Sequence, residues 1–250
     1  ADAARNAAGV VAVLIDDDQL PADAVNSFDK LESWQLGREV EFFGQGYGVI
    51  VATTPEAARA AASLVKVDYA VSEGRFAPDL SQPDELEPEG LRPPVHVGDF
   101  DEAFDSAAYR YDELFTTPIH FPAAMEPHAT LARWDGDQLI LHSSLQSTGG
   151  ATKAVARALD IDQDNIRIIA PFVGGGFGGK TSVGAEAVYA ALASRATARP
   201  VKIVQTRRQV AYLAHHRAPT RQRIRIATDS DGHILAFGHN SAIAQRDHRS

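Results

Sequence analysis

The sequence predicts an α+β protein that is divided into two parts. Short apolar runs of strand length, among them residues 9–15 and 166–173, alternate with helical segments such as residues 185–198. Between the two groups of elements lies a stretch that is rich in Pro, Glu and Asp and shows no hydrophobic period, as expected of a connector. The predicted division is residues 1–72, a connector over residues 73–97, and residues 98–250.

Local signals justify the elements of the first part. Residues 9–15, GVVAVLI, form an apolar run of strand length that is followed by three aspartates. Thr54 suits the N-cap of an Ala-rich helix, and Pro55 suits its first position. With the apolar run YGVIVAT before this helix, residues 47–69 predict a strand, helix, strand unit.

The second part predicts helices and strands in mixed order. A β-hairpin is expected from ATLARW and QLILHSS, because the turn Asp135-Gly136-Asp137 separates them. The remaining strands are expected at residues 109–117, 166–173 and 201–205 and in a last hairpin over residues 223–239. The helices are expected at residues 99–108, 151–161, 185–198 and 207–213.

The composition places the chain among folded globular proteins and excludes several functions. Of its 250 residues, 44% are hydrophobic and 23% charged, which excludes extensive disorder and a fibrous repeat. No apolar run approaches the roughly 18 residues that span a bilayer, and no secretory signal is present, so no membrane insertion is expected. Without cysteine, the chain holds no iron–sulfur cluster through thiolates and has no cysteine nucleophile. Both ends look cut, so we expect a piece of a larger protein.

The charge is unevenly distributed along the chain. From Pro200 onward nine Lys and Arg residues accompany three Asp, whereas the preceding part has fifteen basic and thirty acidic residues. The arginines alternate with apolar residues in TRQRIRIAT, which is typical of one face of a strand. We therefore expect pairing with acidic neighbours or with another chain, and no nucleic-acid binding.

A glycine loop is the candidate functional motif. Residues 174–181, GGGFGGKT, stand between an apolar strand and a helix, where glycines let backbone N–H groups approach a ligand. The loop satisfies a phosphate-loop pattern and also the spacing of a dinucleotide-binding turn. However, a phosphate loop needs an Asp that holds magnesium, and no later strand is an apolar run followed by such an Asp. A dinucleotide-binding turn needs an acidic residue at the end of a second strand, and none is present about 20 positions on. A tightly packed turn without a ligand is the third interpretation.

Several ordered motifs resemble one enzyme family over nearly the whole chain. PFVGGGFGGK, with MEPHATLARWDGDQLILHSSLQ before it, closely resembles the molybdenum hydroxylases, the family of xanthine dehydrogenases and aldehyde oxidases. Residues 1–72 are similar to the end of its α/β hammerhead domain, and residues 98–250 to the first part of its mixed α/β molybdopterin-binding domain. The resemblance is greatest to the large subunit of three-subunit bacterial periplasmic aldehyde oxidases. Because this resemblance accounts for the glycine loop, we interpret its match to the phosphate-loop and dinucleotide-binding patterns as coincidental.

The resemblance implies a set of cofactor-binding residues. In the family a pterin dithiolene holds the molybdenum, so a chain without cysteine is no obstacle. Gln146 matches a glutamine that hydrogen-bonds a molybdenum oxygen, and Phe177 matches an aromatic residue beside the metal. Lys180 is interpreted as a solvated residue without a catalytic role. The glycines that would permit close approach of the cofactor are Gly175, Gly176, Gly178 and Gly179.

Thr181 departs from the xanthine dehydrogenases, which resemble this loop but carry a glutamate that grips the purine. Threonine supplies no such charge, so the resemblance implies an aldehyde, converted to its carboxylic acid with oxygen from water, or another neutral substrate, in preference to a purine. Glu126 and His128 could form a metal site with His120 or His142. However, Pro127 interrupts the segment, and we therefore interpret the motif MEPH as structural. His215 and His216 are expected at the surface.

The resemblance also implies groups that this chain lacks. Family members use a glutamate as general base that would lie beyond Ser250, and the second half of the pterin pocket is also later in sequence. Expected partners are the remainder of the large subunit and subunits with [2Fe-2S] clusters and FAD, and the pterin is expected in its cytosine dinucleotide form. The bacterial cytoplasm and periplasm stay open as locations. The alternatives are a phosphate-loop nucleotide hydrolase and a cofactor-free scaffold module.

Overall fold

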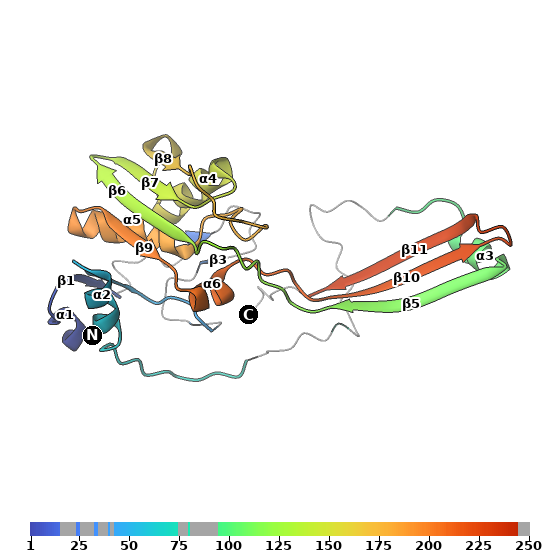
Figure 1. Cartoon of the computed structure of the whole chain (residues 1–250), viewed down its shortest axis with the longest axis horizontal. Helices are drawn as coiled ribbons and strands as arrows, with labels where there is room; N and C mark the ends of the chain where they lie inside the picture. The colour runs from blue at the N-terminus through green and yellow to red at the C-terminus, as the bar shows by residue number, and fades with distance from the viewer. Residues whose placement is uncertain are drawn as a thin grey trace. The chain divides into compact units, whose positions relative to one another are not determined.

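The computed structural model describes residues 1–15, 43–74 and 95–244, together with two short strands and positions 40 and 80. It forms two compact units, Ala1–Ala70 with Phe121–His216 and Val71–His120 with Arg217–Ser250 (Figure 1). The mixture of helices and strands confirms the predicted α+β class. The predicted connector over residues 73–97 lies mostly outside the described residues, so this domain boundary stays a prediction.

The first unit is built on a four-stranded sheet in the order β8-β7-β6-β9 (Figure 1). The predicted hairpin is confirmed: β6 and β7 pair antiparallel, with Asp135 opposite Gln138 across the turn. Strand β9 pairs antiparallel with β6 and β8 parallel with β7, so the sheet is mixed. Its strands are β6 (Ala129–Asp135), β7 (Gln138–Ser143), β8 (Ile166–Ile169) and β9 (Val201–Val204).

Helix α5 (Ala185–Thr197) lies at the centre of this unit. It contacts β6, β7 and β9 of the four-stranded sheet and also β1 (Val10–Leu14) and β4 (Val49–Ala52), which form a separate antiparallel pair. Buried residues therefore occur on every side of the helix, as expected of a helix that is covered all round. Its many alanines permit close packing. One core joins Leu14 and Val51 of the small sheet to Leu139 of β7.

The other helices of this unit end or begin at recognisable caps. In α2 (Pro55–Ala62) the Thr54 hydroxyl accepts a hydrogen bond from the Ala57 N–H at 3.1 Å, which confirms the predicted cap. Helix α6 (Arg207–Leu213) begins with a capping box formed by Thr206 and Gln209. The remaining elements are α1 (Asp2–Arg5), α4 (Thr148–Leu159), the 3₁₀ turn η1 (Gln163–Asn165) and the strands β2 (Ala24–Val25) and β3 (Ser33–Trp34).

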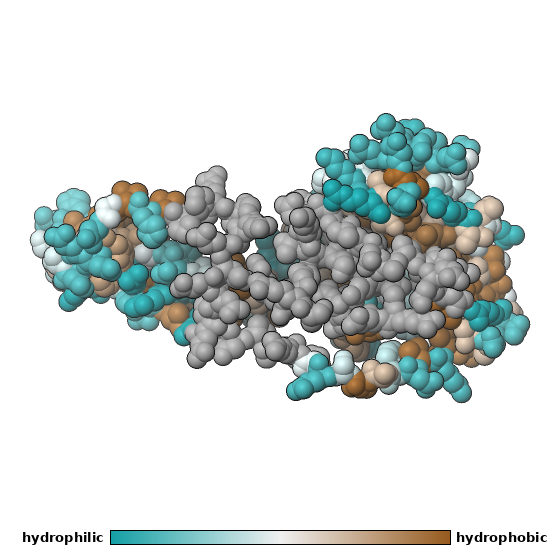
Figure 2. Space-filling model, turned by 180° about the vertical axis from the view of Figure 1, so that it is seen from behind, coloured by the Kyte–Doolittle hydropathy of each residue, from teal (hydrophilic) through white to brown (hydrophobic). Residues whose placement is uncertain are grey.

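The second unit is a three-stranded antiparallel sheet in the order β11-β10-β5, with α3 (Phe100–Ser106) against β10 and β11. The predicted pairing of basic with acidic residues is confirmed by a bidentate contact. Arg223 donates from Nε to Asp112 Oδ1 and from Nη2 to Asp112 Oδ2. This contact lowers the pKa of Asp112. Figure 2 shows hydrophilic and hydrophobic side chains interspersed along this sheet. Its strands are β5 (Tyr109–Thr117), β10 (Thr220–Thr228) and β11 (Ile234–Ile243).

Three expectations about regular structure were wrong in detail. The strand predicted over residues 166–173 ends at Ile169, and the last four residues instead enter the glycine loop. Helix α4 begins at Thr148, three residues earlier than expected, after Ser147 as N-cap. Residues 65–70 form no strand, so the strand, helix, strand unit lacks its last member. Within the described ranges, every helix is too short or too polar to cross a membrane.

Candidate active site

Gln146 is the predicted site residue whose side chain is most firmly oriented. It follows β7 and stands directly before Ser147, the N-cap of α4. Its side-chain Oε1 accepts hydrogen bonds from the Gly178 N–H at 3.1 Å and from the Lys180 N–H at 3.2 Å. Because both partners are donors, the amide oxygen must face the loop, and Nε2 is left as the outward donor of an exposed side chain.

The glycine loop is held in a conformation that favours glycine. Gly174, Gly175 and Gly178 have φ values of 64°, 86° and 87°, in the left-handed region. Phe177 adopts φ 50° in the same loop, where a residue with a side chain is strained by about 1 kcal/mol or more. Phe177 is 68% exposed, so the strain is not offset by burial of this residue within the unit.

Two glycines are needed because neighbouring groups occupy the space of a side chain. A Cβ added to Gly176 would overlap the side-chain amide of Gln146, and one added to Gly179 would overlap the Pro122 ring. The Gly179 N–H also donates to the Gly176 carbonyl at 2.8 Å, which tightens the loop. The structure therefore brings together Gln146, Gly176, Gly178 and Gly179, and Gly175 lies beside Phe177 and Ala124.

Lys180 is not the solvated residue that the sequence suggested. Its side chain is fully buried, and its ammonium donates to the main-chain carbonyls of Glu126, at 3.0 Å, and Val173. Burial lowers the pKa of Lys180 below its ordinary value. Lys180 also precedes α5 by five positions instead of opening it. Both facts contradict the phosphate-loop interpretation, which requires this ammonium to face a bound phosphate.

A buried polar cluster supports the loop from the other side. His128 Nε2 lies 2.8 Å from the Gly179 carbonyl oxygen, so this nitrogen carries a hydrogen and donates it to the loop. Nδ1 is buried and has no partner among the described residues. Glu186, in the first turn of α5, accepts from Gln205 Nε2 at 2.8 Å. Sequence inspection missed Glu186 and Gln205, although a glutamate in an otherwise apolar and Ala-rich helix is a usable signal.

Glu186 carries a testable pH dependence. Burial raises the pKa of its carboxyl above the ordinary 4.5, with His128 and then Gln205 and Lys180 opposing the shift. A raised pKa means that the folded chain binds the proton more tightly, so this contribution to stability is complete below the unfolded pKa and is lost as the pH rises through the folded pKa. The wild type should therefore lose free energy of unfolding relative to Glu186→Gln as the pH rises above about 4.5.

Urea unfolding of both proteins at several pH values measures this difference. Equal dependence of the unfolding free energy on urea concentration in the two proteins provides the control, because it shows that both expose the same surface when they unfold. Parallel profiles of the wild type and Glu186→Gln would contradict the assignment of a raised pKa to Glu186.

Thr181 and the histidines take defined positions. The Thr181 hydroxyl donates to the Gly178 carbonyl at 3.1 Å and is half-buried beside the loop. Glu126, His120, His128 and His142 do not converge: within the described ranges, the only group of potential ligands close enough to hold a metal ion lies elsewhere. His215 is half-buried and contacts Ser182 at 2.5 Å, whereas His216 is exposed as expected.

Arg207 is a further residue that the sequence did not reveal. Its guanidinium donates to the carbonyls of Ala124 and Met125, both at 2.6 Å. Together with Lys180 it holds the segment before β6, whose residue Pro122 packs against the glycine loop. Arg207 begins a short helix in the sequence and therefore gives no local signal of this contact.

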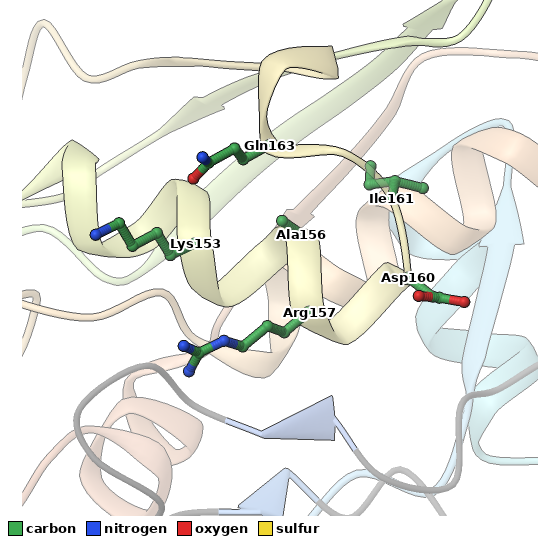
Figure 3. Close-up of a pocket in the computed structure, with 6 residues that line it drawn as sticks. All are labelled: Lys153, Ala156, Arg157, Asp160, Ile161 and Gln163. Carbon is green, nitrogen blue, oxygen red and sulfur yellow. The ribbon is translucent and has the colours of Figure 1, made fainter.

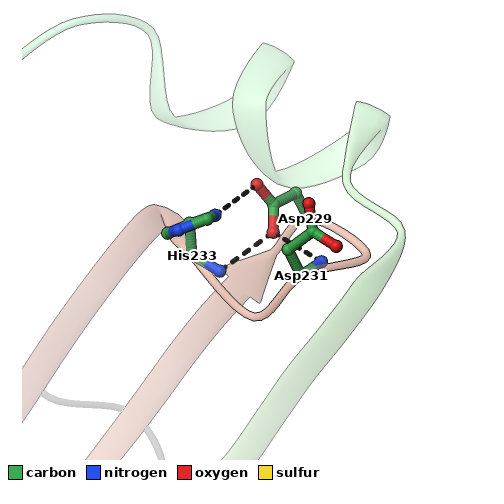
Figure 4. Close-up of side chains that lie close together, drawn as sticks. All are labelled: Asp229, Asp231 and His233. Carbon is green, nitrogen blue, oxygen red and sulfur yellow. Dashed lines mark hydrogen bonds and ion pairs between the residues drawn. The ribbon is translucent and has the colours of Figure 1, made fainter.

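Two other features involve none of these residues. An open hollow of about 470 Å³ is formed by α4 and the turn after it (Figure 3). Gln146 instead precedes the N-terminus of that helix. The group Asp229, Asp231 and His233 lies in the β10–β11 turn of the second unit (Figure 4). Asp229 accepts there from the main-chain N–H groups of Asp231 and His233, both at 2.9 Å, which accounts for the arrangement.

Comparison with known proteins assigns the chain. Residues 84–244 match a family model described as the molybdopterin cofactor-binding domain. The chain belongs to the molybdenum hydroxylase family. Residues 1–73 of this molybdenum hydroxylase chain match a second family model, the a/b hammerhead domain of aldehyde oxidase and xanthine dehydrogenase. The predicted fold class, with a hammerhead part followed by a molybdopterin-binding part, is therefore confirmed.

Curated relatives of this molybdenum hydroxylase chain include an aldehyde oxidoreductase subunit and a probable xanthine dehydrogenase subunit. It is 42% identical over 242 residues to the aldehyde oxidoreductase molybdenum-binding subunit PaoC of Escherichia coli K12, covering 96% of this chain and 32% of the relative. It is 29% identical over 210 residues to a probable xanthine dehydrogenase protein of Bacillus subtilis, covering 79% of this chain and 27% of the relative. The matched region thus spans about a third of the length of these relatives or less.

Solved structures show the same fold. The aldehyde oxidoreductase of Desulfovibrio gigas matches with a TM-score of 0.76 at 24% identity, over 96% of this chain and 28% of that one. Quinoline 2-oxidoreductase from Pseudomonas putida 86 matches with a TM-score of 0.76 at 25% identity, over 96% of this chain and 33% of that one. The chain is a molybdopterin-binding member of an oxidoreductase family, which confirms the coarser part of the predicted function.

Proposed function

We propose that the chain forms one wall of the molybdopterin site in the molybdenum-binding subunit of an aldehyde oxidoreductase. In this proposal the enzyme converts a small aldehyde to its carboxylic acid with oxygen from water. The 42% identity to PaoC supports the aldehyde as substrate. The residues that we assign to the cofactor are Gln146, Gly175, Gly176, Phe177, Gly178 and Gly179.

The observation that carries this proposal is the fixed orientation of the Gln146 amide. Its oxygen is engaged by the main-chain N–H groups of Gly178 and Lys180, which leaves Nε2 as a neutral donor at an exposed position beside the glycine loop. The loop has no Cβ at four of the five positions from 175 to 179, and the Gln146 side chain occupies the space beside Gly176, so the amide lies directly against the loop backbone. These residues fit a molybdenum–pterin group, which needs neutral donors and supplies its own sulfur ligands.

The chain's own residues would bind and orient in this site. When bound, the molybdenum–pterin group supplies the two-electron oxidation and the transfer of oxygen. Gln146 donates a hydrogen bond from Nε2, and Gly178 and Lys180 hold that donor in place through their N–H groups. Thr181 offers a neutral hydroxyl whose hydrogen is directed to the Gly178 carbonyl, and it therefore favours an uncharged carbonyl substrate over a purine.

Other components of the enzyme are proposed from the family resemblance. The remainder of the large subunit would supply the general base and the second half of the pterin pocket. Partner subunits would carry [2Fe-2S] clusters and FAD and would accept the electrons that a chain without cysteine does not relay. We propose the cytosine dinucleotide form of the pterin.

The donor role of Gln146 can be separated from its role in holding the loop. Gln146→Glu keeps an oxygen that accepts from Gly178 and Lys180 but removes the Nε2 donor, whereas Gln146→Ala removes both. In the assembled enzyme we expect each variant to retain molybdenum and to lower kcat for aldehydes at least about 10-fold, a loss of about 1.4 kcal/mol or more.

Metal analysis and steady-state kinetics measure the two effects. The exposed Gln163 on η1 gives the control, since Gln163→Glu makes the same chemical change away from the loop and should leave turnover unchanged. Unchanged turnover in Gln146→Glu would remove the donor from the mechanism. A purified wild type that contains neither molybdenum nor pterin would favour a cofactor-free scaffold.

A further inference from the structure

Lys180 occupies an unusual position for a lysine. Its side chain is fully buried in the first unit, although lysine is among the residues that are rarely buried. Burial of an ammonium group is unfavourable unless hydrogen bonds replace its water. The described partners of Nζ are two main-chain carbonyl oxygens, those of Glu126 and Val173. If this position only needed to be filled, an apolar side chain would fill it without the cost of burying a charge.

The bonds of Lys180 join three segments that meet at the glycine loop. Val173 stands directly before the loop and Lys180 near its end, so the bond from Nζ to the Val173 carbonyl joins the two ends of the loop. The bond to the Glu126 carbonyl ties the loop to the segment before β6. The main chain of Lys180 is paired with Gln146 in both directions, because its N–H donates to Oε1 and its carbonyl accepts from the Gln146 N–H at 2.8 Å.

The loop depends on such ties because its glycines restrict the backbone little by themselves. Five of the six residues from 174 to 179 are glycines, which have the largest conformational freedom in the unfolded or open state. No helix or strand includes these residues, so a regular ladder of hydrogen bonds does not hold them. If the loop moved, the N–H groups of Gly178 and Lys180 would leave Gln146 Oε1, and the side-chain amide would be free to rotate.

We propose that Lys180 is a positioning residue, which fixes the donor end of Gln146 by closing the glycine loop through its buried ammonium group. This inference rests on the proposed function of Gln146. Lys180 touches neither cofactor nor substrate in this proposal. Its effect on the reaction is transmitted through the main chain of residues 178–180 to the amide of Gln146.

A double-mutant cycle between Lys180 and Gln146 tests whether one acts through the other. In the assembled enzyme, Lys180→Met should lower kcat for aldehydes about 10-fold without changing KM or molybdenum content, because only the orientation of the donor is lost. In Lys180→Met/Gln146→Glu the donor is already absent, so turnover should equal that of Gln146→Glu. Multiplied losses in the double variant, or an unchanged kcat in Lys180→Met, would overturn the proposal.

Hydrogen exchange gives a readout that is independent of activity. Lys180→Met should increase the exchange of the Gly178 and Lys180 amides about 10-fold or more, while peptides from β6 and β7 keep the exchange of the wild type. The exposed Lys153 on α4 provides the control, because Lys153→Met removes an ammonium at the surface and should not change the loop. Unchanged exchange of these two amides in Lys180→Met would overturn the proposal that Lys180 holds the loop. This result does not depend on whether the enzyme oxidises aldehydes.

A variant that fails to fold still leaves a decisive measurement. Lys180→Gln retains a shorter donor and is the second variant, with an expected effect in the same direction. In the wild type itself, the tie requires the Gly178 and Lys180 amides to exchange at least about 100-fold more slowly than unstructured amides. Exchange of these two amides at the unstructured rate would overturn the proposal without any substitution.

Discussion

Gly176→Ala is expected to leave the fold intact and to lower aldehyde turnover about 100-fold in the assembled enzyme. An added Cβ would overlap the far end of the Gln146 side chain, which is flexible and is able to move aside. The steric conflict is therefore relieved by displacing the amide from the N–H groups of Gly178 and Lys180, at little cost in stability. A displacement of the Gln146 amide by about 1 Å is sufficient for a loss of this size.

Two other glycines provide matched controls for this variant. Gly149 lies in α4 with open space around it, so Gly149→Ala should raise the free energy of unfolding by about 0.5–1 kcal/mol and leave turnover unchanged. Gly179 faces the rigid Pro122 ring, so Gly179→Ala should lower stability as well as activity. Thermal unfolding and kinetics of the three variants separate these effects. Gly176→Ala with the turnover of the wild type would contradict the assigned position of Gln146.

The isolated 250-residue chain is expected not to oxidise aldehydes. The chain spans 32% of the length of PaoC, and the proposal assigns the general base and half of the pterin pocket to the remaining part. A missing general base alone lowers the rate by about 10²–10⁴. Loss of half of the cofactor contacts should in addition prevent the chain from retaining molybdenum.

Expression of the chain alone and together with the rest of the subunit and its partners tests this expectation. Molybdenum content and aldehyde turnover should both be absent from the isolated chain and present in the assembly. Circular dichroism of the isolated chain provides the necessary control, because only a folded chain gives a meaningful negative result. Turnover by the isolated chain at the rate of the assembly would refute the assignment of the base to other sequence.

The sequence was most informative where local chemistry determines structure. The turn at Gly136 specified the β6–β7 hairpin, and Thr54 with Pro55 specified the start of α2. Motif order indicated that Gln146 and the glycine loop belong together, and the structure brings them into contact. These features depend on a few adjacent residues, or on motifs whose order in the chain carries the information.

The errors arose where tertiary contacts override local pattern. Lys180 looked solvated because its charge and its place after a glycine run suggest a surface loop, whereas carbonyls of Glu126 and Val173 surround its ammonium. Those acceptors are main-chain atoms, which every residue has, so no sequence pattern announces them. The burial of Glu186 and the grip of Arg207 on the segment before β6 likewise depend on contacts with distant residues.

The covering of α5 by two sheets has a consequence for the order in which the chain folds. Strands β1 and β4 complete their core only against a helix that lies roughly 130 to 190 residues later in the sequence. Their other side packs against α1 and α2, but the face that contacts α5 stays uncovered during synthesis until α5 has left the ribosome. Residues 1–73 should depend on chaperones or on rapid completion of translation to avoid aggregation, and we expect them to fold poorly when they are produced alone.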